Sequence, residues 1–476
     1  MPANKPGTRR TEHDTLGPME VPSDALYGAQ TARAVDNFPI SGWVLPSSFL
    51  SALAAIKAAF ARAHGELGLL PEEHAATIAA CASEVADGTH AEHFPVDVFQ
   101  TGSGTSTNMN MNEVLAHLAN SRLGGDPAAK RPVHPNDHVN LGQSSNDVIP
   151  AALRLASWQG WSDRLQPALG AAAAELERLA ERYRSTVALG RTHLMDAVPT
   201  TYGRIFDHWA RRLDAATARI EASADGLREL PLGGTAVGTG IGADPRAVEL
   251  AVAALGATID ADVSAAPNPA AHIAAQDPVI AHADAIAGAA RVLLAIANDL
   301  RLRGSGPFGG LGELALPAVQ PGSSIMPGKV NPVIPEAVAQ AAVQVEGLAS
   351  ACRATASLHQ LDLSHCNPLL AWNLDAMTTL VASSAATLTT RCLAGLSVNR
   401  ERARANAEAS PALATALAGR IGYDAASEVA KTAEREGRPV SVTARKLGVL
   451  PDDELDELLD VDRIAGVGTE GSGGGT

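Results

Sequence analysis

Apolar residues recur at steps of three and four along the middle of the chain, which is the spacing of one face of an α-helix. From Trp161 onward, three such stripes each continue over several turns. They run through Leu165, Leu169, Ala172, Leu176, Leu179 and Tyr183, then through Phe206, Trp209, Leu213, Ala216 and Ile220, and then through Val279, Ala283, Ile286, Ala290, Leu293, Ala297 and Leu300. The pattern predicts long helices that pack side by side.

Two further helical stretches, residues 336–358 and 369–396, bring the number of long helices to about five. Together these long helices predict an up-and-down bundle in the middle of the chain. Residues 52–67 and 74–86 are expected to form shorter helices before it. Because small residues leave helix faces that one bundle does not cover, we expect homo-oligomerisation through the bundle. A monomeric bundle is the alternative.

The segment 304–332 lies between the third and fourth long helices and is dense in glycine and proline. A structureless loop of this length within a compact domain is usually functional, although a flexible interhelical linker is the alternative. Residues 466–476 are nearly all Gly, Ser and Thr, a composition that predicts a flexible tail.

Composition narrows the class of protein. The 476 residues are 46% hydrophobic and carry a net charge of −15, which argues against a disordered scaffold and against a nucleic-acid binder. Aromatic residues make up only 3% while alanine is abundant, and this favours closely packed helices over a β-sandwich. Small molecules or proteins are therefore the expected partners.

Cysteine usage and hydropathy indicate the compartment. Cys81, Cys352, Cys366 and Cys392 are far apart and have no CxxC spacing, so reduced thiols are expected. The first 15 residues contain no apolar core, and no stretch of about 18 apolar residues is free of charge. These features predict a cytoplasmic protein that does not span a membrane.

Two polar clusters precede predicted helices in the first third of the chain. One contains Ser103, Thr105 and Asn108 within residues 101–108. Hydroxyl and backbone N–H groups at a helix start can bind an anion, although an ordinary N-cap is the alternative. The other spans residues 134–147, where a polar ligand site and a surface loop of turn formers are both possible. Its His and Asp spacing matches no common metal site.

Two more polar clusters lie further along the chain. His193, within residues 190–193, can transfer a proton near neutral pH, and a satisfied interhelical histidine is the alternative. Ser323 and Lys329 lie within residues 322–332, inside the glycine-rich loop. A loop of this kind can close over a substrate and bring a catalytic group into place.

Several segments together resemble the aspartase/fumarase superfamily, and most closely class II fumarases. The eleven-residue loop Gly322-Ser-Ser-Ile-Met-Pro-Gly-Lys-Val-Asn-Pro332 is similar to the superfamily motif, which is far more specific than a single GxGxxG. The other matching segments are residues 102–113, 134–137, 143–147, 190–194 and 233–240. The resemblance extends from about Arg10 to about Val467.

The resemblance implies an all-α fold of three mainly helical domains. We place these at residues 1–141, at residues 142–398 with the catalytic loop 304–332, and at residues 399–476. The central bundles of four subunits would form a twenty-helix core, and each active site would be drawn from three chains. The implied partners are a small dicarboxylate substrate and three further copies of the chain, with no nucleic acid and no membrane.

The family reaction is the reversible hydration of fumarate to L-malate, a trans addition and elimination through an aci-carboxylate intermediate. By resemblance, Ser323 is the base that removes the carbon proton, and Lys329 and Asn331 stabilise the developing charge. Glu336 would orient His193 by hydrogen bonding. The implied substrate-binding residues are Ser103, Thr105, Asn108, Ser144, Ser145, Asn146, Thr192 and Ser324. His134, Asn136 and Asp137 resemble the family's second anion site, and no metal or organic cofactor is expected.

Some segments depart from the fumarase pattern. Residues 333–335 read Val-Ile-Pro, which is similar to aspartases, and residues 359–368 replace a more regular fumarase segment. Met195 and Phe308 stand where glutamine and arginine are usual. The alternatives are therefore an aspartate ammonia-lyase, a paralogous lyase acting on another substituted succinate, and a catalytically silent scaffold. Retention of Ser323 together with Lys329 argues against the scaffold.

Overall fold

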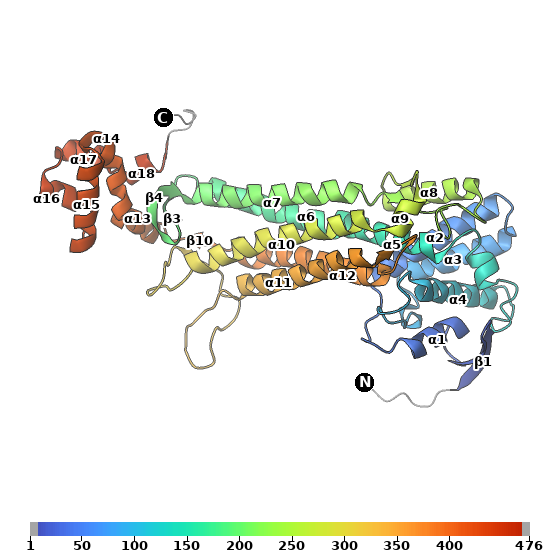
Figure 1. Cartoon of the computed structure of the whole chain (residues 1–476). Helices are drawn as coiled ribbons and strands as arrows, with labels where there is room; N and C mark the ends of the chain where they lie inside the picture. The colour runs from blue at the N-terminus through green and yellow to red at the C-terminus, as the bar shows by residue number, and fades with distance from the viewer. Residues whose placement is uncertain (1–7, 469–476) are drawn as a thin grey trace. The chain divides into compact units, whose positions relative to one another are not determined.

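The computed structural model describes residues 8–468, which divide into two compact units (Figure 1). Of the described residues, the first unit comprises 8–166, 218–288 and 343–381, and the second comprises 167–217, 289–342 and 382–468. The predicted division into three domains stays a prediction. Of the predicted flexible tail, residues 469–476 lie outside the described residues.

The first unit contains most of the shorter helices. They are α1 (Ala29–Asn37), α2 (Ser47–Glu66), α3 (Glu72–Ala86), α4 (Thr105–Arg122), α5 (Ser145–Gln159), α8 (Pro245–Ile259) and α9 (Pro269–Ala274). Helix α2 packs against α3, α5 and α8, and it buries Leu53, Ile56 and Phe60 almost completely. The two helices expected at 52–67 and 74–86 are therefore confirmed as α2 and α3. Short strands pair as β1 (Arg9–Asp14) with β2 (Gly17–Pro22), β5 (Glu229–Leu230) with β6 (Ser264–Ala265), and β8 (His359–Gln360) with β9 (Leu363–Ser364).

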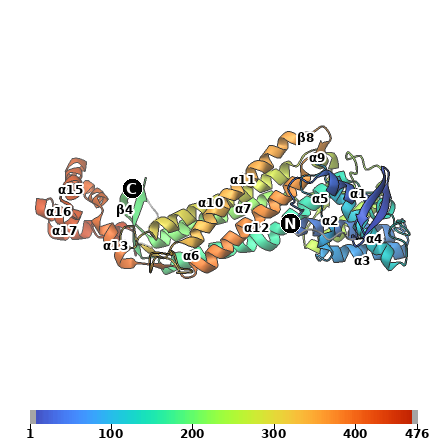
Figure 2. The same cartoon turned by 90° about the horizontal axis from the view of Figure 1, so that it is seen from below.

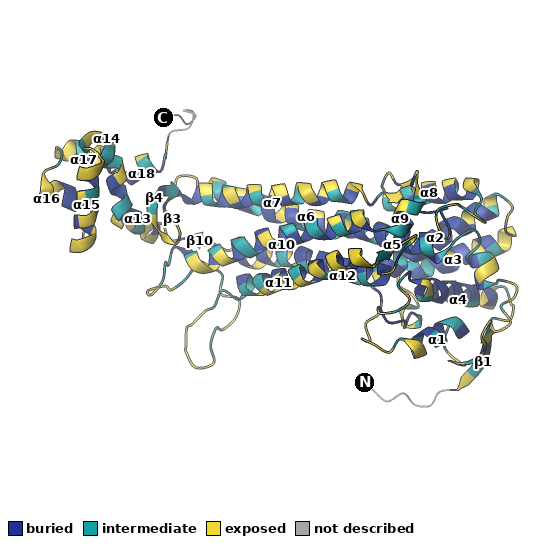
Figure 3. Cartoon of the chain, viewed as in Figure 1, coloured by how far each residue is buried: buried dark blue, intermediate teal, exposed yellow. Residues whose placement is uncertain are grey.

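Five long helices confirm the apolar stripes. They are α6 (Gln166–Arg182), α7 (Tyr202–Asp225), α10 (Asp277–Arg303), α11 (Val333–Ala354) and α12 (Asn367–Leu388). Buried and exposed positions alternate along them as the spacing predicts (Figure 3). Two ends differ from the prediction, because α11 continues only as a 3₁₀ turn, Thr355–Leu358, and α12 as a π-helical turn, Thr389–Leu393. The fold is mainly helical, as expected.

Helix α10 is apolar enough to resemble a membrane span. Within residues 8–468 it is the one helix with the length and hydropathy to cross a bilayer. However, 56% of its most apolar 18-residue window is buried inside the protein. A core helix of a large protein has the same composition, and we assign α10 to the core.

The second unit holds a hairpin that the apolar pattern does not predict. Strand β3 (Val187–Thr192) pairs with β4 (Met195–Thr201), and the hairpin packs against α13 (Arg400–Ala409) (Figure 2). After α13, the chain forms α14 (Ala418–Ile421), α15 (Tyr423–Glu436), α16 (Val440–Leu447), α17 (Asp452–Leu458) and α18 (Val461–Ile464). Their core includes Leu417, Val429 and Leu455, together with Val187 and Leu189 of β3.

The segment 304–332 is a loop, as the glycine and proline content predicts. It starts directly after α10 and ends directly before α11. Its one strand is β7 (Leu314–Ala315), which pairs with β10 (Ser397–Val398) and so ties the first part of the loop to the start of the C-terminal helices. Residues 316–332 contain no helix or strand.

Candidate active site

Amide and hydroxyl groups converge where α4 and α5 begin, in the first unit. The Asn108 side chain, which is 1% exposed, donates from Nδ2 to Asn140 Oδ1 at 3.1 Å and to Ser145 Oγ at 3.1 Å. Its Oδ1 atom is buried and has no hydrogen-bond partner in the described chain. Asn108 and Ser145 are both predicted substrate-binding residues, and the unpaired buried acceptor of Asn108 fits a site that a polar ligand completes.

A buried lysine lies beneath this cluster and was not singled out from the sequence. Lys57 Nζ donates to Asn140 Oδ1 at 2.9 Å, and Asn112 Nδ2 donates to the same oxygen at 3.2 Å. Burial lowers the pKa of Lys57 to about 7, although the nearby carboxylate of Asp147 opposes this. The sequence did contain a signal, since Lys57 is a single charge in the apolar stretch 52–61 of α2.

The start of α5 is fixed by a capping box. The Ser144 hydroxyl accepts from the Asn146 N–H at 3.2 Å, and the Ser144 N–H donates to Asp147 Oδ1 at 2.9 Å. Asp147 Oδ2 also accepts from the Thr235 N–H at 2.9 Å, which ties the segment 233–240 to this helix start. Burial raises the pKa of Asp147 to about 6, against the backbone donors that lower it. Ser144 and Asn146, which the sequence predicts to bind substrate, therefore also take part in capping α5.

The turn before α4 presents Ser103 and Thr105, whose hydroxyl oxygens lie 2.8 Å apart. Ser103 is buried and Thr105 is exposed. The segment that departs from the fumarase pattern packs directly on this turn, because the Asn367 N–H donates to Gly102 O at 3.1 Å. A Cβ atom at Gly102 would lie 1.9 Å from the carbonyl oxygen of His365, so only glycine fits. Residues 359–367 thus support the loop that carries two predicted substrate-binding hydroxyls.

The predicted second anion site forms a separate hollow of about 800 Å³ in the first unit, lined by Lys130, Arg131, His134 and Asp137 among others. His134 Nδ1 accepts from the N–H groups of Asn136 and Asp137, each at 3.2 Å. Two cations, Lys130 and Arg131, line the hollow together with two carboxylates, Asp126 and Asp137. Asn136 is exposed.

Thr192 and His193 lie at the tip of the β3–β4 hairpin in the second unit. Both side chains are exposed, and His193 and Leu194 have positive φ angles of 55° and 62°. Non-glycine residues rarely adopt this conformation, so the tip is held in a strained turn. The sequence identified His193 as chemically capable but did not predict the hairpin that presents it.

Hydrogen bonds within the glycine-rich loop connect the residues of its motif. Ser323 Oγ accepts from the N–H groups of Ile325 at 3.2 Å and Met326 at 3.0 Å. Two N–H donors on one hydroxyl oxygen favour its negatively charged form. Asn331 Nδ2 donates to Gly322 O at 2.7 Å, and the Gly322 N–H donates to Lys329 O at 2.9 Å, so the two ends of the motif are joined.

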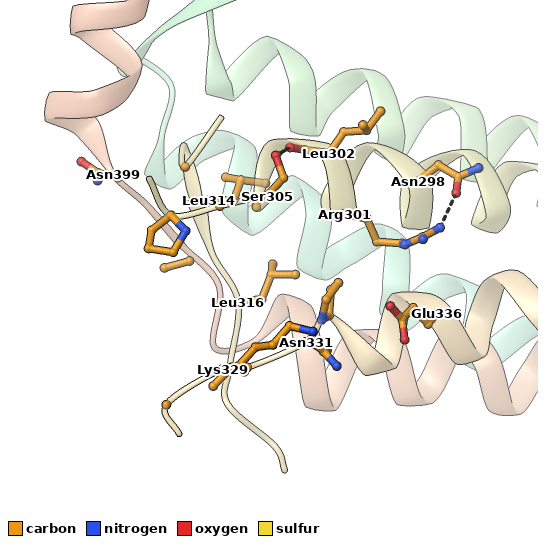
Figure 4. Close-up of a pocket in the computed structure, with 18 of the residues that line it drawn as sticks. Asn298, Arg301, Leu302, Ser305, Leu314, Leu316, Lys329, Asn331, Glu336 and Asn399 are labelled. Atoms are coloured by element: carbon orange, nitrogen blue, oxygen red, sulfur yellow. Dashed lines mark hydrogen bonds between the residues drawn. The ribbon is translucent and has the colours of Figure 1, made fainter. Parts of the chain in front are cut away.

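The loop, the end of α10 and the start of α11 enclose a hollow of about 1050 Å³ (Figure 4). Lys329 and Asn331 lie on its loop side, Arg301 comes from α10 and Glu336 from the first turn of α11. Arg301 is held by Asn298, to whose Oδ1 it donates at 3.2 Å. Two cations against one carboxylate make this hollow suited to an anion. Ser324 is exposed on the loop.

The predicted site residues therefore form separate groups within one chain. The first unit brings Asn108 and Ser145 into contact, while the second holds the hairpin and the loop. Within residues 8–468, no hydrogen bond joins Glu336 to His193, and no group of three His, Cys, Asp or Glu side chains is arranged to hold a metal ion.

Comparisons with known proteins identify the family. Residues 17–347 match the Lyase family, and residues 413–466 match the fumarase C C-terminus family. The chain is 46% identical over 468 residues to the class II fumarate hydratase of Xylella fastidiosa (strain 9a5c), covering 98% of each chain. It is 47% identical over 451 residues to that of Halobacterium salinarum, covering 95% of this chain and 96% of the relative.

Solved structures agree with these relatives. A class II fumarase from Schistosoma mansoni superposes with a TM-score of 0.93 at 34% identity, over 96% of this chain and 99% of that one. A fumarate lyase:delta crystallin from Brucella melitensis bound to cobalt gives a TM-score of 0.92 at 42% identity, over 96% and 100% of the two chains. Each match spans nearly the whole length of both proteins. The chain therefore belongs to the class II fumarase family, within the aspartase/fumarase superfamily of lyases.

Proposed function

We propose that this protein catalyses the reversible hydration of fumarate to L-malate. The observation that carries the proposal is the similarity to class II fumarate hydratases over nearly the whole chain, at 46% identity over 468 residues. Malate loses a proton from C3 and hydroxide from C2, and the hydroxide leaves as water after it gains a proton. Fumarate and water are the products, so the reaction needs a base, an acid and stabilisation of negative charge.

We assign the base to Ser323. The two N–H donors on its Oγ support this role, because they stabilise the oxygen when it is deprotonated. Lys329 and Asn331 hold the carboxylate that becomes doubly negative in the aci-carboxylate intermediate. His193 carries a proton at the pocket, and Glu336 orients it. Since no hydrogen bond joins these two residues within the described part of one chain, the pair would form between subunits.

The amide and hydroxyl cluster binds the substrate in this proposal. Asn108 and Ser145 already share a hydrogen bond, and the unpaired Asn108 Oδ1 is available to the leaving water or to a substrate hydroxyl. The further binding groups are Ser103, Thr105, Ser144, Asn146, Thr192 and Ser324. His134, Asn136 and Asp137 form a second anion site, supported by the adjacent cations Lys130 and Arg131.

We also propose that four copies of the chain assemble around a core of twenty helices, in the cytoplasm. Large apolar side chains remain exposed in the described chain, which supports burial against other copies. Among them are Phe308 at 95%, Ile325 at 83% and Val343 at 63% exposure. The four cysteines are free and buried, which is in keeping with a reducing compartment.

The experiment that tests the reaction is incubation of the purified protein with fumarate, with and without ammonium, followed by chiral identification of the product. L-malate without ammonium supports the proposal. Aspartate formed only with ammonium would replace it with an aspartate ammonia-lyase, which the Val-Ile-Pro sequence at 333–335 favours. If neither malate nor aspartate forms, the substrate is expected to be another substituted succinate, selected through the segment 359–367.

The proposed steps use only proton transfers and charge stabilisation by the protein. We therefore expect exhaustive dialysis against a chelator to leave malate formation unchanged. The measurement compares initial rates before and after chelation, with a zinc-dependent hydrolase as a positive control for metal removal. A rate that falls on chelation and returns with added divalent metal would contradict this assignment.

A further inference from the structure

Glu313 is a completely buried carboxylate at the root of the glycine-rich loop, and four side chains surround it. Its Oε1 accepts from Arg191 at 2.6 Å and from Asn406 at 2.8 Å, and its Oε2 accepts from the Tyr202 hydroxyl at 2.6 Å. Arg303 lies 3.6 Å from Oε2. Burial alone would raise the pKa of Glu313, but these hydrogen bonds outweigh it and the pKa is lowered. The carboxylate is therefore held in its charged form.

The partners of Glu313 come from different elements of the second unit. Arg191 belongs to β3, Tyr202 is the first residue of α7 and directly follows β4, Arg303 ends α10, and Asn406 belongs to α13. The backbone of Glu313 is also paired, with Arg303 O at 2.9 Å and with the Asn399 N–H at 2.9 Å. One residue thus joins both ends of the β3–β4 hairpin to the first part of the loop.

The hairpin is built so that Arg191 reaches this carboxylate. Its register shifts between Leu189 and Arg191, and a bulge of this kind redirects the side chain that follows it. Gly190 allows the bulge, because a Cβ atom there would lie 2.6 Å from Val198 O. Arg191 directly precedes Thr192 and His193, so fixing its guanidinium fixes the base of the strained tip.

The tip itself has little else to hold it. Leu194 is 77% exposed and Met195 is 70% exposed, so packing at the tip cannot set its direction. Strained conformations persist only where the surrounding structure holds them firmly. For this tip, the holding contact is the one between Arg191 and Glu313. The loop also lacks local support, since residues 316–332 contain no helix or strand. Glu313 lies ten residues before Ser323.

We propose that Glu313 is a positioning residue for the reaction, whose buried carboxylate sets the direction of both the hairpin that carries His193 and the loop that carries Ser323. This inference rests on the proposed function. It assigns no contact between Glu313 and substrate. A displacement of about 1 Å at catalytic groups is enough to lower a rate by about 100-fold, so a remote anchor has a measurable effect on turnover.

The test is Glu313→Gln, which keeps the shape of the side chain and removes its charge. We expect kcat to fall by about 100-fold and KM to change much less, because the proposed binding groups of the first unit are untouched and only those on the hairpin and the loop are displaced. We also expect faster hydrogen exchange at the backbone amides of 189–199 and 311–322. Glu454→Gln is the matched control, since Glu454 lies in α17 and accepts a hydrogen bond from Arg420 at 2.7 Å, and α17 packs against α16 and α18.

Two milder variants keep the proposal testable if Glu313→Gln does not fold. Tyr202→Phe and Asn406→Ala each remove one hydrogen bond to the carboxylate, and each should lower kcat by about threefold to tenfold with KM nearly constant. Wild-type kcat in both, or a lowered melting temperature without a change in kcat, would overturn the positioning role. If the wild-type protein formed no malate, the proposed function would fail, and unchanged exchange at 189–199 in the variants would separately overturn the anchor.

Discussion

Lys57 affects both the stability of the folded chain and the charge of the candidate site. Its amine is completely buried in α2, and its hydrogen bond to Asn140 connects it to Asn108 and Ser145. A positive charge next to the amides that we propose bind substrate would favour a dianionic substrate, but burying that charge costs stability. The lowered pKa, about 7 against an ordinary 10.5, reflects this cost.

The titration of Lys57 gives a pH-dependent prediction. Between pH 7 and 10.5 the unfolded chain keeps this lysine protonated while the folded chain releases the proton, so its contribution to stability rises with pH in this window. Lys57→Met removes that dependence. We expect the melting temperature of the variant minus that of the wild type to be highest near pH 7 and to fall as the pH approaches 9. Lys431→Met, at an exposed position of α15, is the control, and its melting temperature minus that of the wild type should not change with pH in this way.

The outcome that would contradict this prediction is a difference for Lys57→Met as flat as that for Lys431→Met. Such a result would mean that Lys57 binds its proton equally well in the folded and unfolded chains. Differential scanning fluorimetry at several pH values is sufficient, because only differences between variants are compared.

His193 allows a second prediction at the residue scale. Asparagine tolerates a positive φ angle better than most residues, so His193→Asn removes the imidazole with little change to the hairpin tip. Loss of a general acid or base lowers rates by about 100-fold to 10,000-fold, and we expect kcat to fall within this range. The pH profile of kcat should also change, because the variant has no imidazole to transfer a proton. Val198→Ala in β4 serves as the control, and an unchanged pH profile in His193→Asn would remove His193 from the chemistry.

At the scale of elements, the sequence predicted the helices and the loop whose signals lie in the spacing of neighbouring residues. The stripe through Val279 and Leu300 predicts α10, since residues three and four apart lie on one helix face. The loop 304–332 follows from its glycine and proline content. Both signals are contained in neighbouring residues, so the long helices and the loop were predicted, except that α11 and α12 end earlier than expected.

The elements that were not predicted depend on distant residues. The β3–β4 hairpin is a two-stranded sheet, which is marginally stable alone, and it is held by Glu313 and α13. The helices α14 and α16–α18 have four to eight residues and share a core assembled with β3. In the site, Lys57 was missed because its apolar neighbours indicate a core helix, and only the folded chain brings Asn140 to its amine.

The loop element leads to a prediction about Ser323. Its hydroxyl accepts two backbone N–H groups, and the motif is also closed by Asn331 and Gly322. Ser323→Ala should therefore keep the oligomer and the melting temperature while abolishing malate formation. Size-exclusion chromatography and a turnover assay separate the two effects. Substantial residual turnover would exclude Ser323 as the base, and Ser324→Ala shows whether the neighbouring hydroxyl takes its place.

At the scale of the whole molecule, the proposed site is shared between chains. The proposed substrate-binding amides and the loop that carries Ser323 belong to different compact units, and the proposal joins them across subunit boundaries. In the proposed assembly each subunit depends on its neighbours, because the base, the proton carrier and the binding amides of one site would come from different chains. Exposed apolar residues such as Val343 are then buried in the same assembly.

Shared sites predict complementation between inactive variants. Asn108→Ala and Ser323→Ala each remove one component from every site of a homotetramer, so both should be inactive alone. In mixed tetramers, some sites receive Asn108 from one variant and Ser323 from the other, and random assortment restores about a quarter of the sites. Co-expression with two affinity tags, purification of the mixed tetramers and a malate assay measure this fraction.

The matched control for this experiment uses two residues of one cluster. Asn108 and Ser145 share a hydrogen bond within a single chain, so a mixture of Asn108→Ala and Ser145→Ala should remain inactive. Activity restored only in the first mixture supports a site drawn from several chains. If that mixture also stays at the level of its parents, while mixed tetramers are present, Asn108 and Ser323 of one chain must serve the same site and the proposed sharing is wrong.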